Sequence, residues 1–291
     1  MTERRIKSKR LHSFVHDPSA VVGSVILLVF ILGALFAPWI TPQNPYDLTE
    51  VSLANSLKPP IWSEDGRKPY LLGTDDQGRD IYSTIVYGCR TSLVVAFSVV
   101  LIAGSFGVLI GLLAGYYGRW IDTLTMRLAD TVFSFSTTLL AILLLGVFKR
   151  SGILTVIAAI CIADWVRYAR TMRGSVLEVK QEAYVMAARA SGANDARILL
   201  RHILPNAIPP ILVVIAVDLA VVIMLEATLS FLGVGVPLTE PSLGMMISTG
   251  QHYVYADMWW MVIFPGIALI LLVVGINLFA DWLREDLNPK I

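Results

Sequence analysis

The sequence predicts an all-α, polytopic membrane protein with six transmembrane helices. Of the 291 residues, 56% are hydrophobic and only 15% are charged, whereas soluble domains carry roughly 25% charged residues. The chain therefore lacks the polar surface that a water-soluble enzyme needs. Its apolar residues also gather in charge-free runs, and about 20 helical residues are enough to cross a bilayer core of about 30 Å.

Four of the predicted spans are apolar runs without internal charge, at 20–40, 91–118, 131–148 and 258–280. The fourth span, 151–163, continues through Asp164, and the fifth span, 207–232, contains Asp218 and Glu226. These two spans need further support, because an ionisable side chain is costly in the middle of a bilayer.

The distribution of basic residues supplies that support, because cytoplasmic loops are enriched in Lys and Arg. Residues 4–10 hold five basic residues and 167–201 hold seven, whereas 227–280 holds none. Arg119 and Arg127 place the turn after the second span inside as well. The chain must then cross the membrane twice before the second basic segment, which supports the fourth span, and both termini are predicted to be cytoplasmic.

The basic N-terminus followed by an apolar run also fits a secretory signal peptide. Signal peptides have an apolar region of only about 7–15 residues and an A-x-A-like cleavage site. The run 20–40 is longer and no such site closes it, so we predict an uncleaved first helix.

The second span carries Gly107, Gly111 and Gly115 at intervals of four, with Ala103 extending the row. Small residues at this spacing form a groove that lets a neighbouring helix approach closely. We therefore predict a central position for this helix in the bundle. The alternative is the ordinary tolerance of membrane helices for glycine.

The outer segment 41–90 contains five prolines and is predicted to be too broken for a long helix. Residues 72–80, with the sequence LGTDDQGRD, are rich in turn formers, and a short segment with polar and aromatic side chains leads from them into the second span. In a purely structural interpretation, Asp80 caps that lead-in helix.

The loop between the fourth and fifth spans is the most informative part of the sequence. Its alanines favour a helix that Gly192 ends in the left-handed conformation. Asn194 or Asp195 then caps a second short helix that ends at Pro205. The apolar side of this second helix is formed by Ile198, Leu199 and Ile203.

A helix, a glycine turn and a second helix make a compact knob that fits a groove on a cytoplasmic partner. The alternative is an interfacial hairpin that its arginines hold to lipid.

Four acidic residues lie in or beside the spans. Asp130 follows Arg127 by three residues and Asp164 precedes Arg167 by three, so both spacings predict a local helical ion pair. Asp218 and Glu226 lie eight residues apart on roughly one face of the fifth helix, about 12 Å along it. We hypothesise that this face borders a translocation path; the rival interpretation is interhelical hydrogen bonding without substrate contact.

Several classes of function are excluded. A net charge of +1 gives no electrostatic footprint for a nucleic acid. Cys89 and Cys161 lie in no CxxC or Cys/His pattern, and His12 and His16 lack a third ligand, so no metal site is predicted. The chain contains no Gly-Lys pair and thus no phosphate-binding P-loop. No catalytic constellation is present.

Ala187-Ala188, then Gly192, then Leu204-Pro205 resembles the signature loop of permease subunits of bacterial ABC importers. Three further segments resemble the second, C-type permease of the dipeptide, oligopeptide and nickel branch, namely 72–80, 229–233 and 282–289. Three positions depart from the pattern: Met186 replaces the Glu of the broad family, Leu243 the frequent Trp of the branch and Asn288 its usual Asp.

The resemblance implies a type I ABC importer permease fold in the bacterial inner membrane. It also implies a second homologous permease chain, two ATP-binding subunits, a periplasmic substrate-binding protein and surrounding membrane lipid, with no nucleic acid. ATP and Mg would be bound by the partner subunits and no cofactor by this chain. The loop that couples to the ATPases would comprise Ala187, Ala188, Ala190, Ser191, Gly192, Ala193, Leu204 and Pro205.

Together with the spans, the resemblance divides the chain into a cytoplasmic segment (1–19), a first transmembrane helix (20–40), a periplasmic loop (41–90), a five-helix permease domain (91–282) that includes the coupling loop (173–206), and a cytoplasmic tail (283–291).

The expected function is to form half of a translocation pathway for di- or oligopeptides or a related small solute, moved inward by alternating access. The rival from another class is a secondary transporter or channel that an ion gradient drives without an ATPase. Such proteins often contain paired repeats, and we find no internal repeat in the sequence.

Overall fold

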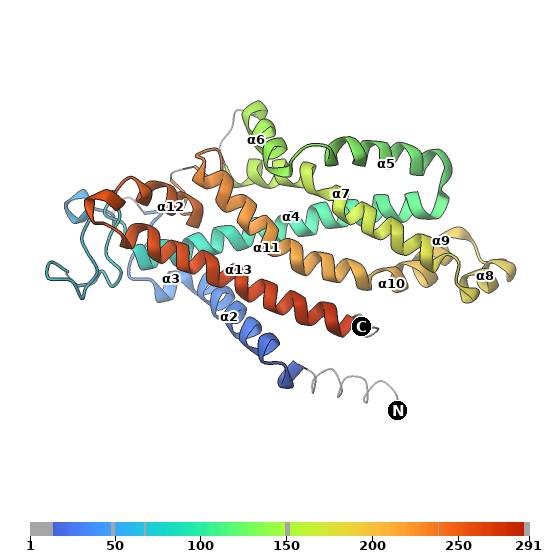
Figure 1. Ribbon diagram of the computed structural model, residues 1–291, viewed down its shortest axis with the longest axis horizontal. Coiled ribbons are helices and arrows are strands. Elements are labelled where there is room, and N and C mark those ends of the chain that lie inside the picture. Colours follow the sequence, from blue (N-terminus) through green and yellow to red (C-terminus); the bar gives the residue numbers. More distant parts are fainter. Residues whose placement is uncertain (1–13, 48–49, 67, 149–151, 238, 288–291) are drawn as a thin grey trace.

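The computed structural model describes residues 14–47, 50–66, 68–148, 152–237 and 239–287. His12, Asn288 and the basic residues 4–10 lie outside these ranges. Long helices run side by side along the molecule, with irregular segments at one end and a short helical hairpin at the other (Figure 1). Within the described residues, the one β pairing is an isolated antiparallel bridge between Thr74 and Asp80.

The helices follow one another in this order: α2 (Pro18–Leu35), α3 (Ala37–Ile40), α4 (Ile81–Tyr117), α5 (Arg119–Phe133), α6 (Thr137–Phe148), α7 (Ile153–Val179), α8 (Ala183–Ala190), α9 (Asp195–Arg197), α10 (Leu204–Ala207), α11 (Pro209–Phe231), α12 (Leu243–Gln251) and α13 (Trp260–Leu287). A π-helical turn, Ile198–Ile203, joins α9 to α10, and 3-10 turns lie at Leu53–Asn55 and Val254–Ala256.

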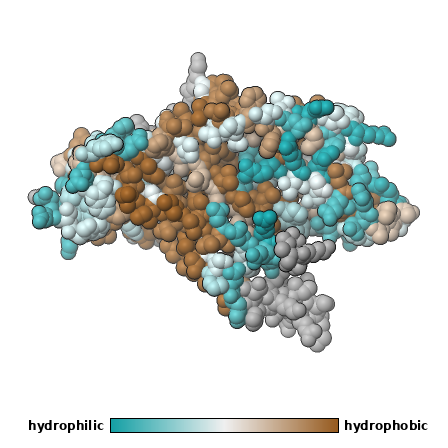
Figure 2. Space-filling model, viewed as in Figure 1, coloured by the Kyte–Doolittle hydropathy of each residue, from teal (hydrophilic) through white to brown (hydrophobic). Residues whose placement is uncertain are grey.

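Among the described residues, four helices are long and apolar enough to cross a membrane: α2, α4, α11 and α13. They correspond to the first, second, fifth and sixth predicted spans. Figure 2 shows hydrophobic side chains over the middle of one face and hydrophilic side chains toward both ends, as expected for a molecule whose middle lies in lipid.

The third predicted span, 131–148, is wrong as a continuous helix. Helix α5 ends at Phe133, and α6 follows it at an angle of 90°. At 12 residues, α6 is about 18 Å long and too short to span a bilayer by itself. The two helices together meet the length and composition of one broken span.

Helix α7 corresponds to the fourth predicted span but runs much further, over 27 residues. Its charged residues keep it out of the set of plainly apolar helices, although a length of about 40 Å is ample for a crossing. The charges that made this span doubtful in the sequence all lie on this one continuous helix.

The second span also begins earlier than predicted. Helix α4 starts at Ile81, so the outer segment ends at Asp80 and not at Arg90. The Asp80 carboxylate accepts a hydrogen bond from the Ser83 amide at 2.8 Å, which confirms the predicted cap. The cap lets the helix start ten residues before the charge-free run 91–118.

The segment before this cap is a compact loop. Thr74 donates a hydrogen bond through Oγ1 to the Asn55 carbonyl at 2.6 Å and accepts one from the Lys58 amide at 2.8 Å. Arg79 and Asp75 form an ion pair with 2.7 Å between Nε and Oδ2. The two hydrogen bonds of Thr74 tie residues 72–80 to the residues around Asn55, and the ion pair stabilises the turn itself.

The glycine row of α4 faces α7. A Cβ atom at Gly107 would lie 2.5 Å from the Trp165 carbonyl oxygen, and one at Gly111 would lie 2.4 Å from that of Ala169. Real Cβ atoms do not approach this closely, so the backbone of α7 occupies the groove. The predicted role of the glycines and the central position of α4 are confirmed.

Helix α2 packs mainly on α13 through a similar contact. A Cβ at Gly23 would lie 2.9 Å from the Phe279 amide nitrogen, and one at Gly275 would lie 2.6 Å from the Ile26 side chain. The first and last described membrane helices therefore lie against each other, on the side of the bundle away from α5 and α6 (Figure 1).

We expect Gly111→Leu to destabilise the protein by at least the ~1–3 kcal/mol typical of overpacking, because the new side chain would meet the α7 backbone. The matched control is Gly146→Leu, since nothing lies within 4 Å of a Cβ at that glycine. Thermal melting of the purified protein in detergent measures both. Equal melting temperatures for the two variants would contradict the close contact.

Candidate functional site

The hairpin between α7 and α11 is built around a glycine turn. Helix α8 ends at Ala190, and Gly192 has a φ of +77°, in the left-handed region. The Gly192 amide donates to the Arg189 carbonyl at 3.0 Å and the Ala193 amide to the Ala188 carbonyl at 3.1 Å. These two bonds satisfy carbonyl groups at the helix end and confirm the predicted stop.

The second half of the hairpin begins with an N-cap. The Asn194 side chain accepts a hydrogen bond from the Arg197 amide at 2.9 Å, so Asn194 is the cap and Asp195 is the first helical residue. The prediction that Pro205 ends this helix is wrong. Proline is tolerated in the first turn of a helix, and Pro205 occupies such a position in α10 after the π-helical turn.

The predicted apolar side of the hairpin turns toward the protein. Ile198, Leu199 and Ile203 are buried and belong to the same hydrophobic cluster as α4 and α7. An interfacial hairpin would instead place such side chains in the lipid. The structure therefore favours the knob over the lipid-bound alternative.

Small residues are exposed around the glycine turn of the hairpin. Ala187, Ala190, Ser191 and Gly192 are exposed, and Met186 beside them is 58% exposed. Pro205 is exposed as well, whereas Ala188, Ala193 and Leu204 are half-buried. The hairpin projects beyond the end of the helix bundle (Figure 1), so its turn offers accessible backbone to a partner.

A second set of candidate residues lies within the bundle, where α7 meets α11. Arg167 pairs with Asp164 at 3.3 Å, as predicted, and also with Asp218, which the sequence did not indicate. The Tyr168 hydroxyl donates to the other Asp218 oxygen at 2.6 Å. One fully buried carboxylate therefore accepts from two neighbouring residues of α7.

Glu226 is also fully buried, but it contacts other elements. Its carboxylate accepts hydrogen bonds from the Ser92 hydroxyl at 2.7 Å and from those of Ser230 and Ser242 at 2.8 Å each. It thereby links α11 to α4 and to the segment before α12. Both carboxylates take part in interhelical hydrogen bonds; their contact with a translocation path stays a prediction.

The predicted pair of Asp130 with Arg127 is wrong. Asp130 pairs with Arg170 of α7 at 2.6 Å, and the same guanidinium lies 4.3 Å from the centre of the Phe133 ring. Because α5 lies along α7, the tertiary partner supplies both a charge and a cation–π contact. A second ion pair between these helices joins Arg173 to Asp122.

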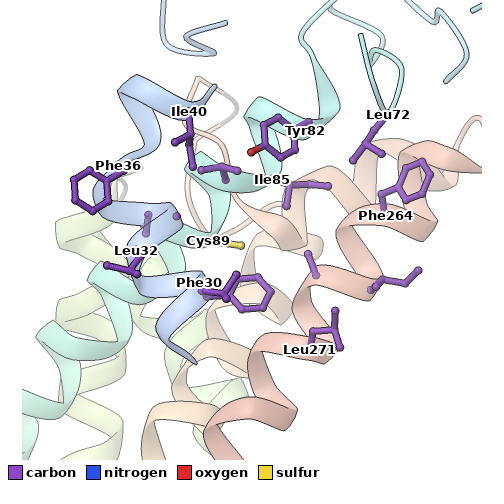
Figure 3. A pocket seen from close by; sticks show the side chains of 16 residues that line it. Phe30, Leu32, Phe36, Ile40, Leu72, Tyr82, Ile85, Cys89, Phe264 and Leu271 are labelled. Carbon is purple, nitrogen blue, oxygen red and sulfur yellow. The ribbon is translucent and has the colours of Figure 1, made fainter. Parts of the chain in front are cut away.

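The helices also enclose hollows of different character. A pocket of about 230 Å³ lies between α6, α7 and α11, and its lining includes Asp164, Arg167 and three threonines. A larger groove of about 640 Å³ lies between α2, α4 and α13 (Figure 3). Its lining is almost wholly apolar, with side chains such as Phe30, Ile85 and Phe264, so it offers no partner to a charged solute.

Within the described residues, no group of three His, Cys, Asp or Glu side chains is placed to hold a metal ion. Cys89 is buried and Cys161 is half-buried, and both are free thiols.

Two family models match the chain. The model described as "Binding-protein-dependent transport system inner membrane component" matches residues 107–291, and that described as "N-terminal TM domain of oligopeptide transport permease C" matches residues 9–60.

Similar proteins include a putative peptide transport system permease of Brucella suis, 38% identical over 100% of this chain and 92% of its own length. The dipeptide transport system permease DppC of Alkalihalophilus pseudofirmus is 39% identical over 94% of this chain and 86% of its own. The oligopeptide transport system permease OppC of Bacillus subtilis is 36% identical over 96% and 88%.

Solved structures share the fold. A chain of the MetNI methionine ABC transporter in an inward-facing conformation has a TM-score of 0.56 at 20% identity, over 71% of this chain and 97% of that chain. A chain of an amino acid ABC transporter has a TM-score of 0.54 at 18% identity, over 70% and 94%. The type I ABC importer permease fold is thereby confirmed.

These matches support an importer permease and not a transporter that an ion gradient drives. A permease of this kind works with a paired permease, a substrate-binding protein and separate ATP-hydrolysing subunits. The ATPase activity resides in the ATP-hydrolysing subunits. With family models over most of its length and full-length relatives at 36–39% identity, the chain belongs to the binding-protein-dependent transport system inner membrane component family, as a multi-pass permease subunit of an ABC importer.

Proposed function

We propose that this chain forms half of the translocation path of an importer for dipeptides, oligopeptides or a related small solute. Its full-length relatives are named as permeases of peptide, dipeptide and oligopeptide transport systems, which supports this substrate class. A second homologous permease would complete the path, two ATP-binding subunits would dock on the cytoplasmic face and bind ATP and Mg, and a periplasmic protein would deliver the solute. This chain itself would bind no cofactor.

The observation that carries the proposal is the projecting hairpin with its exposed glycine turn. Its apolar side is anchored in the bundle, and the residues exposed at its glycine turn, Ala190, Ser191 and Gly192, are small. A partner can therefore contact the backbone closely and displace the hairpin as a unit. We assign the coupling contact to the residues predicted from the sequence, with Ala187, Ser191 and Gly192 at its exposed centre.

The proposed orientation places the hairpin and both termini in the cytoplasm. One end of the molecule holds the start of α2, the end of α13 and the hairpin (Figure 1). The other end holds α12 and the compact loop before α4. Arg189, Arg197 and Arg201 are exposed at the hairpin end, which agrees with the enrichment of basic residues on the cytoplasmic side. The domain limits derived from the sequence fit this orientation, with the periplasmic loop shortened to 41–80.

We place the path along the face formed by α6, α7 and α11. Arg167 is 38% exposed there, although it lies within a membrane-crossing helix. A charge in lipid costs at least about 2.5–3.5 kcal/mol on insertion scales, so this face borders water or the paired permease. The buried carboxylate of Asp218 pairs with Arg167, and Glu226 lies further along α11.

Replacing Gly192 by Val is expected to leave membrane insertion intact but to uncouple ATP hydrolysis from import. A β-branched residue is strained at a φ of +77°, and its side chain would project at the docking surface, since nothing lies within 4 Å of that position. ATP consumed per peptide imported should rise several-fold in proteoliposomes that contain the whole importer.

Gly174→Val is the matched control, because a Cβ at Gly174 also meets nothing within 4 Å and that glycine lies on α7, outside the hairpin. Normal coupling in the Gly192 variant would refute the proposed role of the turn.

Asp218→Asn and Glu226→Gln test the path. A hydrogen bond to a charged group contributes about 1.5–3 kcal/mol, so we expect each variant to change the KM or the maximal rate of peptide import by about tenfold. Melting temperatures of the assembled complex separate this effect from stability. If both variants melt earlier but import with wild-type KM and rate, the carboxylates are interhelical links only.

A further inference from the structure

Helix α4 connects the two ends of the molecule without a break. It runs for 37 residues from Ile81 to Tyr117, a length of about 55 Å. Its first residues adjoin the compact loop before α4, and its last turn reaches the hairpin at the other end (Figure 1). No other described helix is as long.

Tyr116, in the last turn of α4, contacts three separate parts of the hairpin region. Its hydroxyl donates to Asp195 Oδ1 at 2.5 Å, across the start of α9. Its carbonyl accepts a hydrogen bond from the Lys180 ammonium at the end of α7. The face of its ring lies 5.4 Å from that ammonium and 5.9 Å from the Arg189 guanidinium of α8. The tyrosine is only 4% exposed, so these partners enclose it.

The covalent connections of the hairpin are less direct. On one side α7 ends at Val179 and a turn leads into α8. On the other side the chain passes a π-helical turn and the prolines at 205, 209 and 210 before α11 is established. The π-helical turn interrupts the α-helical hydrogen-bond pattern, and the turn after Val179 separates α7 from α8. Both connections are therefore interrupted, whereas α4 is continuous.

The outer end of α4 contacts the elements that close that end of the bundle. A Cβ at Gly88 would lie 3.3 Å from the Leu243 amide nitrogen, at the start of α12. Ser92, one turn further along, donates to Glu226 of α11. A displacement of α4 along its axis would act on both contacts at once.

We propose that Tyr116 is a positioning residue that fastens the coupling hairpin to α4, so that movement of the hairpin reaches the outer end of the bundle through this one helix. The inference rests on the proposed function, because it takes the hairpin as the contact to the ATPases. This route is non-covalent, and it bypasses the interrupted connections of the hairpin to α7 and α11. The hydrogen bond between Tyr116 and Asp195 is the link that substitution removes most cleanly.

The test uses the whole importer in proteoliposomes, with a mixture of labelled di- to pentapeptides as the probe. Tyr116→Phe and Asp195→Ala each remove the hydrogen bond, and we expect each to raise the ATP consumed per peptide imported by at least fivefold. The double variant should be no worse than either single variant, because both remove the same link. Asp195→Asn keeps an acceptor oxygen and should restore coupling to near the wild-type value.

Tyr117→Phe is the matched control. Tyr117 is 46% exposed, and among the described residues its hydroxyl makes no hydrogen bond. This variant should couple normally. A merely structural role for the Tyr116 hydroxyl would lower the melting temperature without changing the ratio of ATP to peptide, and that result would overturn the proposal.

A second measurement does not depend on the peptide. Spin labels at Arg90→Cys on α4 and Val254→Cys after α12, in a background with both native cysteines replaced by Ser, report the distance across the outer end. We expect Mg-ATP to change this distance in the wild type, in Tyr117→Phe and in Asp195→Asn, but not in Tyr116→Phe.

An unchanged response in Tyr116→Phe would refute the route through α4. Loss of ATPase binding in both Tyr116→Phe and Asp195→Ala would refute it as well, since the link would then serve docking. A wild-type complex that imports none of the peptides but shows the distance change would instead count against the proposed substrate class alone.

Discussion

The close packing of α7 in the glycine groove of α4 is the contact on which the rest of the structure depends. Because the backbones touch at Gly107 and Gly111, the register between the two helices is set within one turn. That register fixes which side of α7 turns to α11, and so brings Arg167 and Tyr168 to Asp218. It also brings the ends of both helices together beneath the hairpin, where Lys180 meets Tyr116.

Much of this arrangement follows from local signals in the sequence. A glycine after an alanine-rich helix predicts a left-handed stop wherever the chain folds, and Gly192 has that conformation. The spacing of the α4 glycines predicts a close helix contact because lipid competes poorly for such a groove. The fold class, the hairpin between α7 and α11 and the Asp164–Arg167 pair were predictable for the same reason: each depends on residues within a few turns of one another.

The features that the sequence did not reveal depend on residues far apart along the chain. Asp130 has a basic residue three positions away, yet its partner is Arg170, forty positions on. The break between α5 and α6 occurs in a run without charge or proline, so hydropathy alone joins the two helices. A proline ends a helix only where its position requires a backbone N–H donor. Pro205 lies in the first turn of α10, after the π turn, where no such donor is required. Glu226 meets Ser230 one turn along its own helix, but its other partners, Ser92 and Ser242, come from distant parts of the chain that no local spacing indicates.

The pairing of Gly23 with Gly275 has a consequence for biosynthesis. Helix α2 leaves the ribosome before α13, which supplies its main contact surface; its contact with α4 is smaller. Until α13 has been made, most of the surface of α2 therefore faces lipid. Its apolar sequence suits that interval, and the docking of α13 on α2 makes completion of the bundle depend on a helix that is synthesised much later.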